Sequence, residues 1–89
     1  MKKYRIAICF WADAYNFEID YIKDFCYKPR AIKWLEKNRN KLYEEEAKPY
    51  EKEYYAIDAQ IEAWDKEDFI GVVYSIQLCE KGEKKKWNT

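Results

Sequence analysis

Residues 28–47, KPRAIKWLEKNRNKLYEEEA, form the one segment whose pattern clearly predicts a long helix. At 100 degrees per residue, several apolar side chains fall within about 80 degrees of Leu35. These side chains are Ala31, Ile32, Leu42 and Tyr43. Asn38 and Arg39 interrupt this stripe, so we expect a narrow apolar face.

Two prolines bracket the predicted helix. Pro29 suits its first turn, where the missing N–H would have no partner in any case. Pro49 disfavours helical geometry at Lys48 and is expected to end the helix there. Residues 48–53 are charged and contain this proline, so they are predicted to form a loop.

The segments on either side of the helix alternate between apolar and polar residues, as strands do. Residues 3–12 and 17–25 form one predicted hairpin with a turn at 13–16, and residues 54–64 and 69–79 form a second with a turn at 65–68. Residues 15–26 also fit a helix whose stripe is Tyr15, Ile19, Ile22 and Cys26. β-Branched and aromatic side chains favour the strand there.

The sum is an α+β fold, β-β-α-β-β: a four-stranded, mostly antiparallel sheet with one helix packed on one face. Residues 1–80 are expected to make the single domain, and 81–89 a polar tail that frays, although its Trp87 is unusual for a tail. Gly71, within the last strand, indicates a bulge or a close approach of another chain segment.

One helix cannot cover both faces of such a sheet. The alternation places a mixed set of side chains on the uncovered face, among them two tryptophans, Trp11 and Trp64. The full predicted set is Arg5, Ala7, Cys9, Trp11, Glu18, Asp20, Ile22, Asp58, Gln60, Glu62, Trp64, Val73, Ser75, Gln77 and Cys79. This face is a candidate for self-association or for the stacking of bases, as in proteins that bind single strands. An exposed strand edge is a second route to self-association. The alternative is that the tail or the 48–53 loop covers one of the two tryptophans.

The chain lacks the residues that several kinds of catalytic and binding site require. The chain has no histidine, one serine and two glycines, so it carries no Ser-His or Cys-His pair, no histidine metal site and no glycine-rich phosphate loop. We therefore predict no catalytic residue, no metal and no cofactor. Carboxylates are plentiful enough for an acid–base pair, which keeps a small enzyme as a minor alternative.

Cysteine count and hydropathy indicate the compartment. Cys9, Cys26 and Cys79 are odd in number and far apart, which is not the pattern of a disulfide framework. A reduced, cytoplasmic protein is the expectation. No apolar run reaches the length of a membrane span, so no membrane partner is expected.

Charge is balanced overall but divided into blocks. The formal net charge is zero, which argues against non-specific nucleic-acid binding as the main activity. Residues 1–41 hold ten basic and five acidic side chains, and residues 42–80 hold three basic and eleven acidic ones. Such blocks favour steering of a charged partner.

The helix carries a basic stripe on its far side. Its members, spaced by three or four residues, are Arg30, Lys33, Lys37 and Lys41, with Trp34 beside them. The stripe could meet phosphates while Trp34 stacks on a base. The alternative is an ordinary solvated helix face, because Lys and Arg are good helix formers.

Acidic residues follow from the last turn of the helix onward. The predicted acidic patch consists of Glu44, Glu45, Glu46, Glu51, Glu53, Asp65, Glu67 and Asp68. It could occupy a basic groove of another protein, and charge complementarity would speed that association. The alternative is a solvated loop and turn.

The leading hypothesis is a small non-enzymatic protein-binding module, with a homodimer as a further expectation. A sharper version is a phage or mobile-element inhibitor that occupies a protein surface of a host defence nuclease. A nucleic-acid-binding protein that uses the basic helix face is the second hypothesis.

Overall fold

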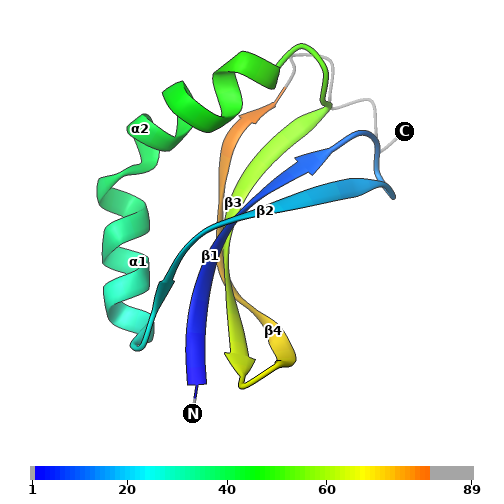
Figure 1. The fold of residues 1–89 in the computed structure, drawn as a ribbon. Helices are drawn as coiled ribbons and strands as arrows, with labels where there is room; N and C mark the ends of the chain where they lie inside the picture. Colours follow the sequence, from blue (N-terminus) through cyan, green and yellow to red (C-terminus); the bar gives the residue numbers. More distant parts are fainter. Residues whose placement is uncertain (1, 81–89) are drawn as a thin grey trace.

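The fold comes from a computed structural model that describes residues 2–80 (Figure 1). The predicted tail 81–89, with Trp87, lies outside the described residues. The elements in chain order are β1 (Lys2–Trp11), β2 (Phe17–Phe25), α1 (Lys28–Lys37), α2 (Arg39–Leu42), a π-helical turn η1 (Tyr43–Ala47), a 3-10 turn η2 (Lys48–Tyr50), β3 (Ala56–Asp65) and β4 (Asp68–Glu80).

The four strands form one antiparallel sheet in the order β2-β1-β3-β4. The predicted α+β class and β-β-α-β-β order are therefore confirmed, and the segment 15–26 contains a strand rather than a helix. Asp13 fixes the first hairpin turn, because its carboxylate accepts hydrogen bonds from the backbone N–H groups of Tyr15 and Asn16. The second hairpin is tighter than predicted, with only Lys66 and Glu67 between its strands.

The predicted single helix is instead two α-helices followed by the two short turns. The break lies at Asn38, whose backbone N–H and side-chain Nδ2 both donate to the Trp34 carbonyl at 2.9 Å. Asn and Asp side chains commonly compete with the helical hydrogen-bond ladder in this way. The break lets the second half of the segment follow the curved sheet, as Figure 1 shows.

The core lies between this helical segment and the sheet. It contains Ile6, Ile8 and Phe10 from β1, Ile57, Ala59 and Ile61 from β3, and Ala31, Leu35, Leu42 and Ala47 from the helical segment. The predicted inward stripe of the helix is confirmed, because Ala31, Leu35 and Leu42 are buried. Central strands β1 and β3 supply most of the core, since edge strands have a neighbour on one side only.

Register shifts change which side chains of the edge strands share a face. One lies between Ile6 and Ala7 of β1, opposite Ile22, and three lie along the β3–β4 ladder. Each extra residue reverses the alternation beyond it. The prediction for the uncovered face is therefore wrong for five residues, which lie on the helix side: Glu18, Asp20, Ile22, Val73 and Cys79. Phe17, Ile19, Tyr21 and Val72 lie on the uncovered face instead.

Candidate functional site

Two of the hollows in the described part of the molecule combine several aromatic rings with carboxylates from distant segments. One lies on the helix side, between β2 and η1. The other lies on the face of the sheet that no helix covers. They differ in charge and in how their side chains are held.

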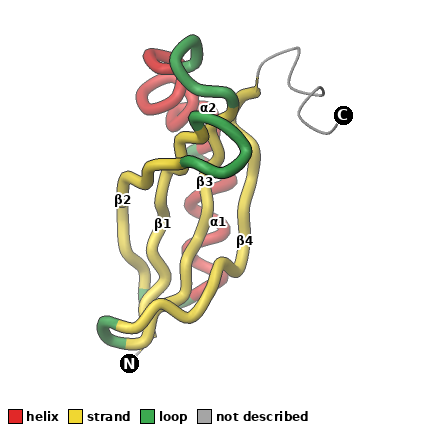
Figure 2. The backbone as a smooth tube through the Cα atoms, turned by 90° about the vertical axis from the view of Figure 1, so that its right-hand side faces the viewer, coloured by secondary structure: helices red, strands yellow, loops and turns green. Residues whose placement is uncertain are grey.

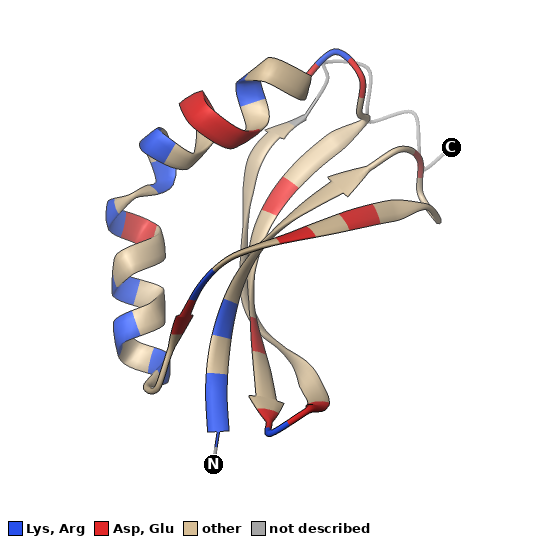
Figure 3. Ribbon diagram, in the orientation of Figure 1, with Lys and Arg blue, Asp and Glu red and all other residues tan. Residues whose placement is uncertain are grey.

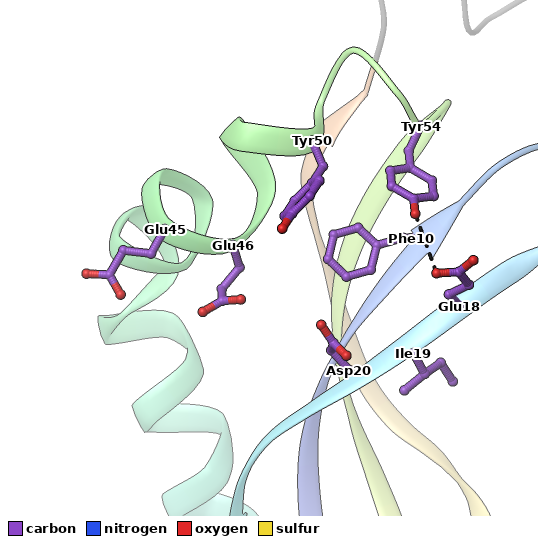
Figure 4. A pocket seen from close by; sticks show the side chains of 8 residues that line it. All are labelled: Phe10, Glu18, Ile19, Asp20, Glu45, Glu46, Tyr50 and Tyr54. Carbon is purple, nitrogen blue, oxygen red and sulfur yellow. Dashed lines mark hydrogen bonds between the residues drawn. The ribbon is translucent and has the colours of Figure 1, made fainter.

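The hollow on the helix side, which we call the acidic cleft, has a volume of about 300 Å³. Figure 4 shows its lining. The charged members are Glu18 and Asp20 of β2 and Glu45 and Glu46 of η1; the aromatic members are Phe10, Tyr50 and Tyr54, and Ile19 completes the set. Figure 3 shows the same charges as red bands on β2 and on the helical segment facing it.

Local structure explains why four carboxylates line one cleft. Glu18 and Asp20 pair with Phe10 and Ile8 of β1, whose side chains enter the core, so both carboxylates point to the helix side. Leu42 and Ala47 anchor the π-helical turn in the core. Glu45 and Glu46 lie between these anchors; Figure 4 shows the Glu46 carboxylate on the side of β2, whereas the Glu45 carboxylate points outward at the rim of the cleft.

Three aromatic rings form the wall of the cleft toward β3. The Phe10 ring lies 5.8 Å from the Tyr50 ring, nearly perpendicular to it, and 5.1 Å from the Tyr54 ring. The Tyr54 hydroxyl donates to Glu18 Oε1 at 3.5 Å. Burial, followed by the charges of Glu18 and Glu53, raises the pKa of Tyr54. The Tyr54 hydroxyl therefore stays a hydrogen-bond donor in this negative environment.

The cleft has little compensating positive charge. Within residues 2–80, Asp20, Glu45 and Glu46 make no ion pair, and the nearest ion pair along η1 joins Lys48 Nζ to Glu44 Oε1 at 3.5 Å. Carboxylates beside aromatic ring faces create an environment suited to a cation.

The uncovered side of the sheet carries the second hollow, of about 470 Å³. Figure 2 shows this side turned to the viewer, with α1 behind the strands. We call its exposed or half-buried apolar members the aromatic face: Trp11, Phe17, Ile19, Tyr21, Trp64, Phe69 and Val72. All four strands contribute to it.

Ring contacts join the aromatic face across neighbouring strands. Trp11 and Phe17 have ring centroids 4.8 Å apart, and Trp64 and Phe69 have centroids 5.6 Å apart. Tyr21 and Trp64 meet edge to face at 6.5 Å. Such cross-strand aromatic pairs stabilise a sheet and fix its register.

A buried carboxylate holds the centre of the aromatic face. Glu62 is only 2% exposed, and its Oε1 accepts hydrogen bonds from the Tyr21 hydroxyl and from Trp64 Nε1, both at 2.9 Å. Gln60 Nε2 donates to Oε2 at 2.7 Å. Burial and the Glu62 bond raise the pKa of Tyr21, which keeps the hydroxyl protonated as a donor.

A cation and a second carboxylate extend this network. The Arg5 guanidinium lies 4.7 Å from the centre of the Tyr21 ring and 5.2 Å from that of Trp64, and its Nε is 3.2 Å from Asp24 Oδ1. At the other end, Trp11 Nε1 donates to Asp58 Oδ2 at 3.0 Å. The rings of Trp11, Tyr21 and Trp64 are therefore fixed in position before any partner binds.

The predicted basic stripe lies on the solvent side of the helical segment. Arg30, Lys33, Lys37 and Lys41 are all exposed. Trp34, however, is half-buried, and its ring packs 6.0 Å from that of Phe25. It packs against the edge of the core and keeps part of its surface exposed.

The predicted acidic patch is divided between opposite ends of the sheet. Glu44, Glu45, Glu46, Glu51 and Glu53 lie at the end where β1 finishes, whereas Asp65, Glu67 and Asp68 lie at the β3–β4 turn, beside the start of β1. Figure 3 shows this separation. A ten-residue strand spans roughly 33 Å, so the two groups cannot act as one patch.

Several residues of these surfaces were not identified from the sequence. Glu18 and Asp20 join the acidic cleft, and Phe17, Tyr21 and Phe69 join the aromatic face. The alternation of residues 17–21 was visible, but alternation alone does not say which set faces the helix. The predicted surface tryptophans, Trp11 and Trp64, do lie on the uncovered face.

Comparisons with protein-family models, with curated proteins and with solved structures find no match to this chain. None of the helices in residues 2–80 is long and apolar enough to cross a membrane. In the same part of the chain, no three cysteine, aspartate or glutamate side chains lie close enough together to hold a metal ion.

Proposed function

We propose that this chain is a small protein-binding module that acts by occupying a basic surface of another protein. The observation that carries the proposal is the acidic cleft, in which four carboxylates from β2 and η1 border three aromatic rings. The proposal assigns no reaction, metal or cofactor to the chain.

The lining of the cleft favours a lysine or arginine side chain. An arginine that enters it would place its guanidinium against ring faces and its N–H groups toward carboxylates. Cation–π contacts contribute about 0.5–1 kcal/mol at exposed sites and about 2 kcal/mol when desolvated. Charge-assisted hydrogen bonds to carboxylates add to this and orient the planar guanidinium.

A sharper form of the proposal is a phage or mobile-element inhibitor of a host defence nuclease. A surface that holds nucleic acid is rich in lysine and arginine, because these side chains neutralise phosphates. An acidic, aromatic-lined cleft is complementary to such a surface, and long-range attraction would speed the encounter. The inhibitor would then act by covering the surface.

A charge-reversal experiment tests the role of the cleft. The Glu45→Lys/Glu46→Lys variant should weaken binding of a tetra-arginine peptide at least tenfold, measured by titration calorimetry at low salt. The Glu67→Lys/Asp68→Lys variant makes the same charge change at the far end of the sheet and should weaken it much less. Equal weakening by both variants would mean that only net charge matters, and the cleft would be rejected as the site.

The same two variants identify the physiological partner. As baits for affinity capture from the native host, the wild type and the Glu67→Lys/Asp68→Lys variant should retain a common protein that the Glu45→Lys/Glu46→Lys variant loses. A partner retained equally by all three baits would contradict the proposal that the cleft makes the contact.

The second candidate function is nucleic-acid binding by the basic helix face. It is supported by Arg30, Lys33, Lys37 and Lys41, all exposed and without an ion pair inside the described range. Anisotropy of a labelled 20-nucleotide DNA or RNA should then rise at low salt and fall steeply as salt increases. The Lys33→Glu/Lys37→Glu/Lys41→Glu variant should abolish the signal, and unchanged binding would reject this function.

A further inference from the structure

We infer that the aromatic face is the interface between two copies of this chain, whose sheets pack against each other face to face. The inference goes beyond the proposed function. It concerns the opposite side of the sheet from the acidic cleft, and the two clefts would remain accessible on the outside of the dimer.

The composition of the aromatic face departs from that of a solvated sheet face. An antiparallel sheet with one wet side normally carries polar residues there. Here Phe17, Tyr21, Phe69 and Val72 are each about half exposed, at 50%, 46%, 53% and 50%. They surround the half-buried Trp11, Trp64 and Ile19. Apolar side chains from all four strands therefore line one hollow on this face.

The area of this surface fits a dimer of minimal stable size. Large apolar and aromatic side chains have roughly 150–250 Å² each, so the four half-exposed ones present on the order of 300–500 Å². The partly exposed Trp11, Trp64 and Ile19 bring the total to on the order of 500–700 Å². Stable interfaces start at roughly 600 Å² per partner. Packing the aromatic face of one copy against that of another would therefore bury an area within that range.

The charges of the aromatic face favour a second copy over a strongly charged partner. Arg5 is paired with Asp24 at 3.2 Å, and Glu62 is buried with three donors. Asp58 accepts a hydrogen bond from Trp11. Opposite charges on a partner would find little to bind here. An apolar surface without a dominant sign of charge is instead complementary to itself, as a two-fold interface requires.

The face is also rigid, which lowers the entropy cost of association. Glu62 fixes Tyr21 and Trp64, and Asp58 fixes Trp11. Side chains that are already ordered lose little rotamer freedom on binding. Two such sheets would stack about 10 Å apart with their strands within about 30 degrees of each other, as in a β-sandwich.

The strand edges offer a weaker route to self-association. Edge strand β2 carries Glu18, Asp20 and Asp24, and the β1–β2 ladder is interrupted by a bulge. The ladder of the other edge strand, β4, contains three register shifts. Charges and bulges both discourage edge-to-edge pairing. Face-to-face packing is therefore the arrangement that the fold favours.

Sedimentation velocity over about 1–200 µM tests the interface directly. The wild type should form a species of twice the 11.0 kDa chain mass, with dissociation on dilution. Phe17→Lys and Phe69→Lys, on opposite edge strands, should each raise the dissociation constant at least tenfold. The matched control is Tyr27→Lys, because Tyr27 is 64% exposed and precedes α1, away from the aromatic face; it should leave the dimer unchanged.

Circular dichroism establishes that each variant is folded, and two variants on separate strands leave the test intact if one fails to fold. A wild type that stays monomeric at 200 µM overturns the inference. A dimer that survives both folded substitutions also overturns it. Neither result affects the proposed role of the acidic cleft, which is tested with substitutions on the other side of the sheet.

Discussion

The two faces of the sheet bury their residues in different ways. On the helix side, branched aliphatic chains such as Ile6, Ile8 and Ile61 are fully buried beneath α1 and α2. On the uncovered side, Ala7, Cys9 and Glu62 are buried beneath aromatic rings of the sheet itself. The comparison shows how a sheet face that no helix covers can still bury residues. Aromatic side chains of the strands lie over them, provided that a polar anchor holds the rings in place.

Cys9 tests whether the aromatic side chains really close over the uncovered face. Cys9 is 1% exposed, and burial, with added repulsion from Asp58 and Glu62, raises the pKa of its thiol to about 12 from 9.0. At pH 8 this lowers the thiolate fraction about a thousandfold, and the thiolate is the reactive form.

We therefore expect iodoacetamide to modify the exposed Cys26 at least a hundredfold faster than Cys9, as measured by peptide mass spectrometry. Denatured protein is the control, in which the difference should disappear. Comparable rates in the native protein would show that the rings open readily, and the distinction between the two faces would break down.

Truncation of aliphatic side chains compares the two faces in stability. Ile61→Ala removes a side chain with no exposed surface on the helix side, and should cost about 2–5 kcal/mol in the free energy of unfolding. Val72→Ala removes a half-exposed side chain on the aromatic face, and should cost less than about 1 kcal/mol in the monomer. Urea denaturation of dilute protein measures both, and equal losses would contradict the two-face description.

Replacement of the buried carboxylate tests the polar anchor. Glu62→Gln keeps the shape of the side chain but turns an NH₂ group toward one of the three donors now bonded to Glu62. A donor without an acceptor in a buried site costs about 1–3 kcal/mol. The exposed Glu67→Gln is the matched control and should change the free energy of unfolding by less than about 0.5 kcal/mol. Equal stability of the two variants would show that Glu62 is not an anchor.

Sequence patterns predicted where the helices and strands lie better than they predicted which side of the sheet each side chain occupies. Alternation identified both hairpins, and helical spacing placed Ala31, Leu35 and Leu42 on the buried side, because these periods depend on local geometry. The break at Asn38 coincides with the interruption of the apolar stripe, but a polar pair in a helix does not by itself predict a break.

The contents of the two candidate surfaces could not be predicted in the same way. A single bulge at Ile22 decides whether Glu18 and Asp20 face the helix or the aromatic side, and no residue in that stretch marks a bulge. The acidic cleft depends on which side of the sheet Glu18 and Asp20 face. It also depends on a contact between segments more than twenty residues apart. Glu62 looked like an ordinary outward residue of a strand, because its donor Tyr21 is brought to it only by the register of three strands, whereas its donor Trp64 lies nearby on the same strand.

Gly71 gives the smallest effect and the finest test of how β4 is built. The sequence indicated a bulge or a close approach there. Register shifts do lie beside it, but a Cβ added at Gly71 would have no atom within 4 Å, which rules out a close approach. Its φ is not positive, so alanine fits the backbone. Gly71→Ala should therefore raise the free energy of unfolding by about 0.5–1 kcal/mol, because the unfolded chain loses flexibility. A loss of stability in urea denaturation would mean that β4 needs glycine to pass between its neighbouring bulges, and that its register is strained rather than relaxed.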